Sequence, residues 1–296
     1  MEVTGEMPLW VAARALLAAR GDDFFRRWKK VRETFDPEAI HDLRVSSRRL
    51  REGLLLFNPV YPPDTIARVA KRVRMVTRIL GEMRNTDEAL LFFRELAGEP
   101  ETPCREPLDL LISRFENLRE KERQKLQEGL SALDPKEIAR LFARTVGGPC
   151  LFSPPPAGID PFSNLASFAR ERMEERLADL LALVAAARHE QNIAAHHQLR
   201  IAVKHYRYRL EIFSPLIVKG YEELHTAVKG YQETLGKMHD LDVFAGIVQE
   251  AGLPPAAEAS LMDAIAARRG RFFARFSEML ERTPPEAIGA RVRSSW

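Results

Sequence analysis

Residues 41–57 read HDLRVSSRRLREGLLLF, and residues 197–213 read HQLRIAVKHYRYRLEIF. The two stretches align without a gap, and six of their 17 positions are identical. In both, apolar residues recur with the spacing of an α-helix that buries one face. The expected N-cap residues, Asp36 and Asn192, align at the same offset. The chain therefore contains an internal repeat built on an amphipathic helix.

The repeat continues beyond this helix, because residues 80–87, LGEMRNTD, align with residues 235–242, LGKMHDLD. Asp87 and Asp242 are expected in the first turn of a new helix, where an acid complements the helix dipole. Long segments without strand-like alternation, separated by proline and glycine, predict helices throughout the chain. Their expected ranges are 8–35, 37–58, 63–82, 87–97, 105–132, 135–146, 161–188, 193–213, 217–238, 241–250, 255–282 and 285–291.

We therefore expect an all-α fold in which residues 1–296 form a single domain of two pseudo-symmetric helical-bundle halves. The halves are residues 1–147 and 161–296, joined by a proline-rich linker at 148–160. The only cysteines, Cys104 and Cys150, form no C-x-x-C motif, which argues against a zinc ribbon or a disulfide scaffold and fits a reducing cytosol. No uncharged apolar run of about 18 residues is present. A cytoplasmic protein without membrane contact is expected.

The repeated helix carries its basic side chains on the face opposite its apolar residues. At 100° per residue, the histidine and three cations of each copy fall within an arc of about 80°. These stripes contain no acid, although solvated helix faces usually mix signs to form ion pairs. Such groups bind oxyanions, and a stripe about 15 Å long suits a linear chain of phosphates that both stripes could hold in one groove. The first stripe is His41, Arg44, Arg48 and Arg51, and the second is His197, Arg200, Lys204 and Arg207.

A less symmetric group of basic residues lies around the two Leu-Gly pairs. Its members are Lys71, Arg74, Arg78, Arg84, Lys229 and His239. The segments 41–51, 67–84 and 197–209 carry net charges of +3, +5 and +4, whereas the whole chain carries +3. The remaining residues are therefore net acidic. Concentrated basic segments within an otherwise acidic chain predict that a thin polyanion can bind and that bulkier polyanions are excluded.

These motifs resemble the CHAD family, the conserved-histidine α-helical domain. The pattern His-x-x-Arg-x-x-x-Arg/Lys-x-x-Arg occurs twice, beginning at His41 and His197, and the Leu-Gly element also occurs twice. The similarity extends over roughly residues 7–285. It implies two helical halves around a basic central pore or groove, and non-enzymatic binding of inorganic polyphosphate by the basic residues named above. It further implies association with polyphosphate granules, no cofactor or metal, and phosphate or sulfate as a stand-in for the ligand in crystals.

Two other functions remain open. His41-Asp42 and His239-Asp240 are His-Asp doublets, as in HD-type phosphohydrolases that hold a divalent metal, although Asp42 aligns with Gln198. The stripes could also follow a single-stranded nucleic acid. Such sites usually interleave aromatic side chains for base stacking, and here the apolar residues occupy the opposite face. The sequence therefore favours polyphosphate over nucleic acid.

Overall fold

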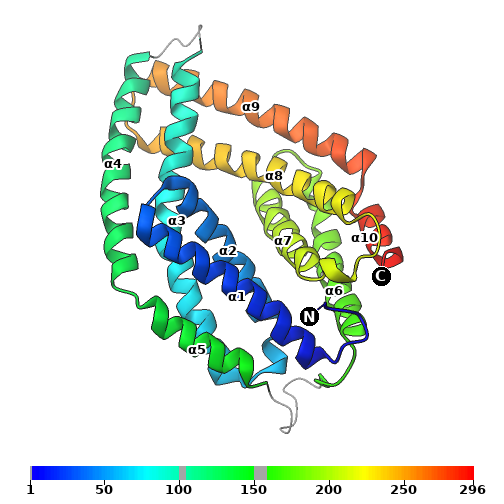
Figure 1. The fold of residues 1–296 in the computed structure, drawn as a ribbon. Helices are drawn as coiled ribbons and strands as arrows, with labels where there is room; N and C mark the ends of the chain where they lie inside the picture. The colour runs from blue at the N-terminus through cyan, green and yellow to red at the C-terminus, as the bar shows by residue number, and fades with distance from the viewer. Residues whose placement is uncertain (1, 100–104, 150–158) are drawn as a thin grey trace.

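A computed structural model describes residues 2–99, 105–149 and 159–296, which form ten α-helices (Figure 1). The first five are α1 (Leu9–Thr34), α2 (Pro37–Leu56), α3 (Pro63–Ala97), α4 (Arg105–Ser131) and α5 (Pro135–Gly147). The last five are α6 (Leu165–Ala187), α7 (Ile193–Ile212), α8 (Tyr221–Glu250), α9 (Pro255–Arg282) and α10 (Pro285–Ser294). The predicted all-α fold is confirmed.

Most of the predicted linker at 148–160 lies outside the described residues, and so do both cysteines, Cys104 and Cys150. Among the helices of the described ranges, none combines the length and the apolar composition needed to cross a membrane.

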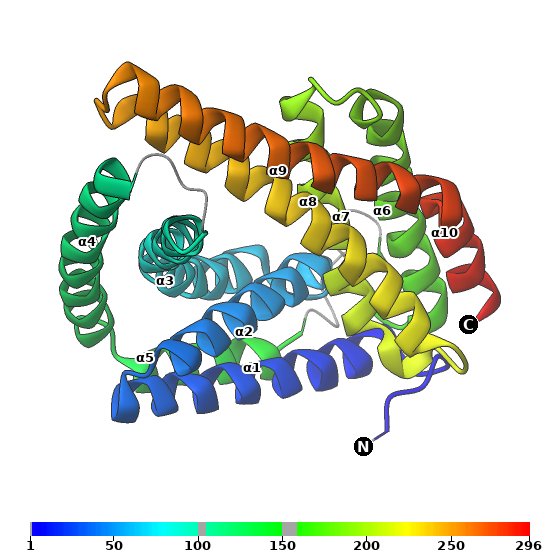
Figure 2. The same cartoon turned by 90° about the horizontal axis from the view of Figure 1, so that it is seen from above.

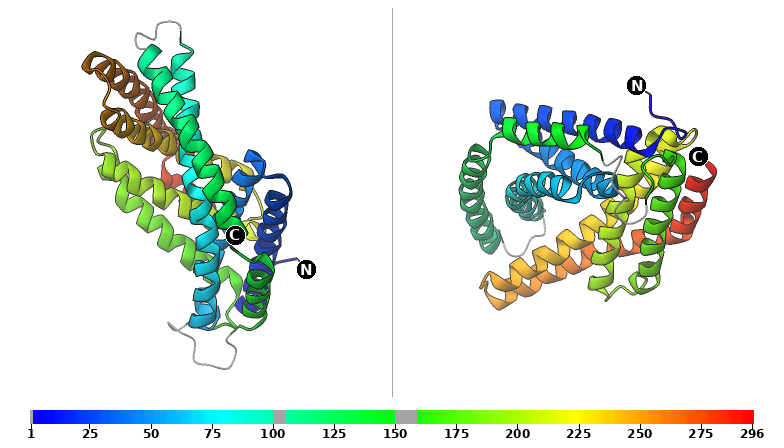
Figure 3. Two further views of the ribbon diagram at one scale, coloured as in Figure 1. Left: turned by 90° about the vertical axis from the view of Figure 1, so that its left-hand side faces the viewer. Right: turned by 90° about the horizontal axis from the view of Figure 1, so that it is seen from below.

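The first five and the last five helices pack in the same order. In the first set, α2 contacts α1 and α3, α3 contacts α4, and α5 packs on α1 and α3. In the second set, α7 contacts α6 and α8, α8 contacts α9, and α10 packs on α6 and α8. Figures 1 and 2 show the two long pairs, α3 with α4 and α8 with α9, running side by side. Figure 3 shows α5 lying along α1.

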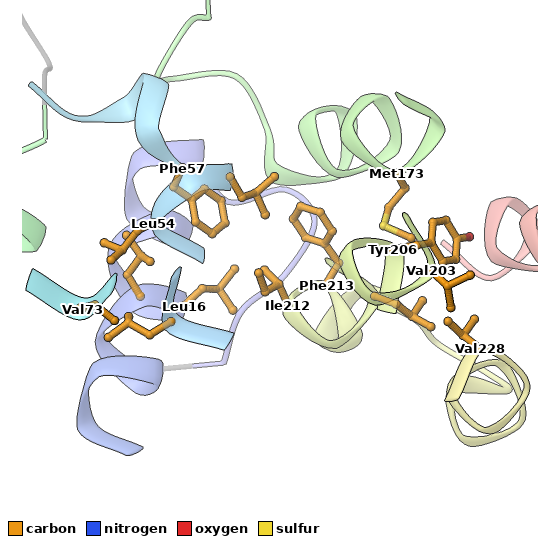
Figure 4. Close-up of a cluster of buried hydrophobic side chains, with 14 of the residues drawn as sticks. Leu16, Leu54, Phe57, Val73, Met173, Val203, Tyr206, Ile212, Phe213 and Val228 are labelled. Atoms are coloured by element: carbon orange, nitrogen blue, oxygen red, sulfur yellow. The ribbon is translucent and has the colours of Figure 1, made fainter. Parts of the chain in front are cut away.

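The two sets of helices meet where α2 packs against α7. Phe57 and Phe213, which occupy aligned positions just after these helices, are both fully buried and lie edge to face with ring centroids 6.4 Å apart. Phe57 also stacks on Phe168 of α6, with centroids 5.8 Å apart. Figure 4 shows Phe57 and Phe213 between side chains of the first set, such as Leu54, and those of the second, such as Val203. This packing holds α2 and α7 side by side.

A second, smaller hydrophobic cluster joins the distal ends of α3 and α4 to α8 and α9. Its centre is the stacked pair Phe92 and Phe244, with centroids 4.5 Å apart. The basic segments of α2, α3, α7 and α8 therefore lie between two regions of buried apolar contact. These contacts restrain the relative positions of the four helices.

The predicted helix breaks after residues 82 and 238 are wrong, because α3 and α8 run on without interruption through Gly81 and Gly236. A glycine inside a helix costs about 1 kcal/mol relative to alanine, and the buried neighbours Leu80 and Leu235 offset that cost by packing in the core. Asp87 and Asp242 therefore lie inside long helices, where they pair with Arg119 of α4 at 2.6 Å and Arg269 of α9 at 2.5 Å. They bind neighbouring helices together and do not cap a helix.

Candidate functional site

Helices α2 and α7 are positioned by the same local interactions. The side chain of Asp36 accepts a hydrogen bond from the backbone N–H of Ala39 at 3.0 Å, and Asn192 accepts one from Ala195 at 3.1 Å. Both residues are therefore N-caps, as predicted. The apolar residues that follow are buried, namely Leu43, Leu50, Leu54, Leu199, Val203, Tyr206 and Leu210. With these faces packed in the core, the basic stripes turn away from it.

Cations of the two stripes lie close enough in the structure to lower one another's pKa. Burial, followed by the charges of Arg48 and Arg200, lowers the pKa of Lys204 to about 8. Burial, together with Arg48 and Arg84, lowers the pKa of Arg44 to about 10. Arg48 of α2 thus acts on side chains of both α2 and α7. We call the group His41, Arg44, Arg48, Arg84, His197, Arg200, Lys204 and His239 the basic seam.

Arg49, His205 and Arg209 lie beside the stripes on α2 and α7, and each pairs with a buried carboxylate. Buried Glu52 accepts hydrogen bonds from His205 at 2.6 Å and from Arg209 at 3.1 Å. Although burial raises it, these partners hold the pKa of the Glu52 carboxyl below its usual value. Glu211 pairs in the same way with Arg49 at 2.7 Å. The fold therefore supplies buried carboxylates to cations beside the stripes and leaves most seam cations without one.

Two arginines of the seam have an unused hydrogen-bond donor. The Nε atoms of Arg44 and Arg200 are buried, and neither has an acceptor among the described residues. An unpaired buried donor costs about 1–3 kcal/mol. An anion that reaches these atoms would remove that cost and reduce the repulsion among the cations. Both effects favour an oxyanion ligand.

The three seam histidines come from three helices. The Nδ1 atoms of His197 in α7 and His239 in α8 lie 3.3 Å apart. Burial, then Arg200 and His197, lowers the pKa of His239 to about 4. Burial and neighbouring cations also lower the pKa of His41 and that of His197. All three shifts favour the neutral form of these rings in the free protein.

The carboxylate of Asp240 in α8 enters the seam, whereas in the sequence this residue stands out only as part of the His239-Asp240 doublet. Asp240 is half-buried, and its carboxyl interacts with Lys237, Arg200, Arg84 and Arg44. Burial raises the pKa of Asp240, and these cations oppose the increase. Its alignment with Asn85 in the repeated Leu-Gly element, directly after His239, is the sequence feature that could have identified it.

Three further first-half residues predicted for the site, Arg51, Lys71 and Arg74, lie beyond one end of the seam. A cavity of about 590 Å³ between α2, α3 and α7 is lined by Arg51, Lys71 and Arg74, together with Arg48 and Lys204 of the seam. After burial, Arg74 is the main cause that lowers the pKa of Arg51. Arg51, Lys71 and Arg74 thus continue the row of cations away from His41.

Three other predicted residues are placed elsewhere. Arg207 is buried, lies 3.5 Å from Glu211 and has its guanidinium 5.1 Å from the ring centre of Tyr208. Lys229 pairs with Glu233 at 3.5 Å on the surface of α8. Arg78 is exposed and lines neither of the basic cavities that flank α3. Arg84 does face the seam, although it also pairs with Glu88.

The two His-Asp doublets do not form a metal site of the kind found in HD-type phosphohydrolases. Asp42 pairs with Arg27 of α1, and its neighbour His41 is surrounded by arginines. Within the described ranges, no group of three or more His, Cys, Asp or Glu side chains is arranged to hold a metal ion.

A family profile and one solved structure name the same domain. The profile of the CHAD domain matches residues 15–249. The crystal structure of the CHAD domain from the plant Ricinus communis superposes with a TM-score of 0.65 at 25% identity, covering 99% of this chain and 94% of that one. PptA from Streptomyces chartreusis superposes with a TM-score of 0.69 at 20% identity, covering 93% of this chain and 100% of that one. A search of curated proteins finds no significant match.

Proposed function

The chain belongs to the CHAD domain family, and we propose that it binds inorganic polyphosphate in the basic seam without chemically altering it. The observation that carries this proposal is the convergence of the two stripes. Arg48 of α2 lies among Arg200 and Lys204 of α7, and the arginine Nε donors beside it have no acceptor among the described residues. A ligand with negative charges along its whole length satisfies several of these groups at once.

The shape of the seam favours a thin linear ligand. The seam extends about 10 Å along α2 from His41 to Arg48, and Arg51 lengthens the row of cations to about 15 Å, which is long enough for several consecutive phosphates.

Most aromatic residues of the repeated helices are packed in the core, as with Phe57, Tyr206 and Phe213. Tyr208 lines the cavity beside Arg48 and Lys204, but its ring is covered by Arg207. Single-strand binders typically interleave several aromatic side chains for base stacking. Polyphosphate therefore fits the seam better than RNA does.

The main test removes one arginine from each stripe. Replacing Arg44 and Arg200 together with alanine should weaken polyphosphate binding by at least about a hundredfold, because each hydrogen bond to a charged group contributes about 1.5–3 kcal/mol. The plot of log affinity against log salt concentration should also become less steep, because fewer counterions are released. Isothermal titration calorimetry at several salt concentrations measures both quantities.

The matched control replaces two exposed cations of other helices, Lys30 of α1 and Lys136 of α5, with alanine. This variant should bind nearly as well as the wild-type chain. Equal losses in the two variants would contradict the site, because affinity would then follow net charge alone. Three further measurements test the finer claims: polyphosphate length after incubation with the protein and Mg²⁺, competition by single-stranded RNA at equal phosphate concentration, and colocalisation of a fluorescent fusion with polyphosphate granules.

A further inference from the structure

A second basic groove lies outside the seam, between α3 and α5. Its volume is about 770 Å³, and its walls carry five cations and one acid. These residues are Arg68, Lys71 and Arg72 of α3, and Glu137, Arg140 and Arg144 of α5. Because its charged residues come from both helices, the groove exists only where α5 packs on α3.

Most of the cations in this groove have no carboxylate partner. Glu137 pairs with Arg72 at 3.3 Å. Lys71, Arg140 and Arg144 are exposed and form no ion pair with any described residue. Since like charges on facing helices repel one another, these cations do not stabilise the packing of α5 on α3.

The second set of helices shows that this fold does not require cations here. Helix α10 packs on α6 and α8 as α5 packs on α1 and α3. At the offset of the Leu-Gly repeat, however, Arg68, Lys71 and Arg72 of α3 align with Glu223, Thr226 and Ala227 of α8. The same kind of helix contact forms there without these three cations on α8, so a structural role does not explain the charges that α3 contributes to the α3–α5 groove.

The groove is continuous with the seam through one residue. Lys71 lines both the α3–α5 groove and the cavity that contains Arg48, Arg51, Arg74 and Lys204. Cations therefore follow one another from the seam, past Arg51 and Arg74, to Lys71 and on to Arg140 and Arg144. A flexible chain of phosphates bound in the seam and leaving it at this end would meet these side chains next.

We propose that the α3–α5 groove binds the segment of a long polyphosphate chain that extends beyond the seam, so that the protein binds long chains more tightly than short ones. This inference rests on the proposed function and adds a second, one-sided part to its site. Because α8 has no cation at the positions aligned with Arg68, Lys71 and Arg72, the cationic contact surface extends farther beyond the α3 end of the seam than beyond the α8 end.

The test compares two ligand lengths and three variants of the full chain. Arg140→Ala/Arg144→Ala removes two exposed groove cations, Arg44→Ala/Arg200→Ala disrupts the seam, and Lys30→Ala/Lys136→Ala removes two exposed cations that line neither site. Calorimetry is performed with tripolyphosphate and with polyphosphate of several tens of phosphates, and circular dichroism checks the fold of each variant.

We expect the groove variant to bind the long polyphosphate about five- to tenfold more weakly and tripolyphosphate within about twofold of wild type, with the control unchanged for both. Equal losses for both lengths, or no loss for the long chain, would overturn the groove assignment while leaving the seam in place. A loss confined to single-stranded RNA of matched charge would also overturn it. If the wild-type chain binds neither polyphosphate, the proposed function fails, and this inference fails with it.

Discussion

Asp240 provides the sharpest test of how the seam works, because its carboxylate occupies a region that a polyanion must approach. Arg44, Arg84 and Arg200 all act on this carboxylate, so it competes with phosphate for the same cations. Replacing Asp240 with asparagine removes the negative charge and keeps the shape of the side chain. We expect the D240N variant to bind polyphosphate more tightly than the wild-type chain.

The expected gain follows from Coulomb's law. A carboxylate and a phosphate roughly 8 Å apart repel by about 1–2 kcal/mol at effective dielectric constants of about 20 to 40. This corresponds to about five- to thirtyfold in affinity, and screening by salt places the expected gain near the lower end. The slope of log affinity against log salt concentration should also become steeper by up to about one, because one more cation is available to phosphate.

The stability of the variant separates this effect from a change in folding. Burial raises the pKa of Asp240 despite the neighbouring cations, so the ionised carboxylate is less favourable in the folded chain than in the unfolded one. The asparagine side chain in the D240N variant carries no charge and avoids that cost. The free energy of unfolding in urea should therefore be unchanged or slightly higher.

The assay is calorimetric titration of the D240N variant with polyphosphate at pH 7.5. Glu233→Gln is the matched control, since Glu233 is an exposed acid on the same helix and pairs with Lys229. The control should bind like the wild-type chain. Equal or weaker binding by D240N would refute the reasoning, because it would mean that Asp240 holds the arginines in position and does not compete with the ligand.

Two further predictions concern the core and the histidines. Phe57→Ala should lower the free energy of unfolding in urea by about 3–5 kcal/mol, because the ring is fully buried against Phe168 and Phe213. The control Leu55→Ala should lower it far less, because Leu55 is 55% exposed. Similar losses in the two variants would contradict the described core. For the histidines, the pKa of His41, His197 and His239 is lowered in the free protein, so its stability should fall as pH drops below about 6.5. Bound polyphosphate should raise these pKa values, so its affinity should increase as pH drops below about 6.5. The loss of Tm with falling pH should then be smaller for the bound protein than for the free protein. If the difference in Tm between the bound and the free protein does not depend on pH, the histidines do not face the ligand.

The structure of individual helices could be predicted from the sequence because it depends on neighbours within a few residues. The N-caps Asp36 and Asn192 and the buried faces of α2 and α7 follow from a period of 3.6 residues, which relates each side chain to those three and four positions away. The doubled histidine and arginine pattern likewise identified the family without knowledge of any tertiary contact. The helical class and the residues that share a helix face therefore follow from the order of the amino acids alone.

Contacts between helices depend on packing between residues that are far apart in the sequence, so local sequence patterns do not predict them. The continuity of α3 and α8 through Gly81 and Gly236 depends on buried neighbours that outweigh a local glycine penalty. Arg207 has the same position in its motif as Arg51, yet it turns to Glu211, while Arg51 lies beside Arg74 of α3. Asp240 enters the seam because α8 packs on α7. Lys71 connects the seam to the α3–α5 groove because α3 packs on both α2 and α5. A helix face determines which charges lie together on one helix, whereas the packing of helices determines which charges of other helices they meet.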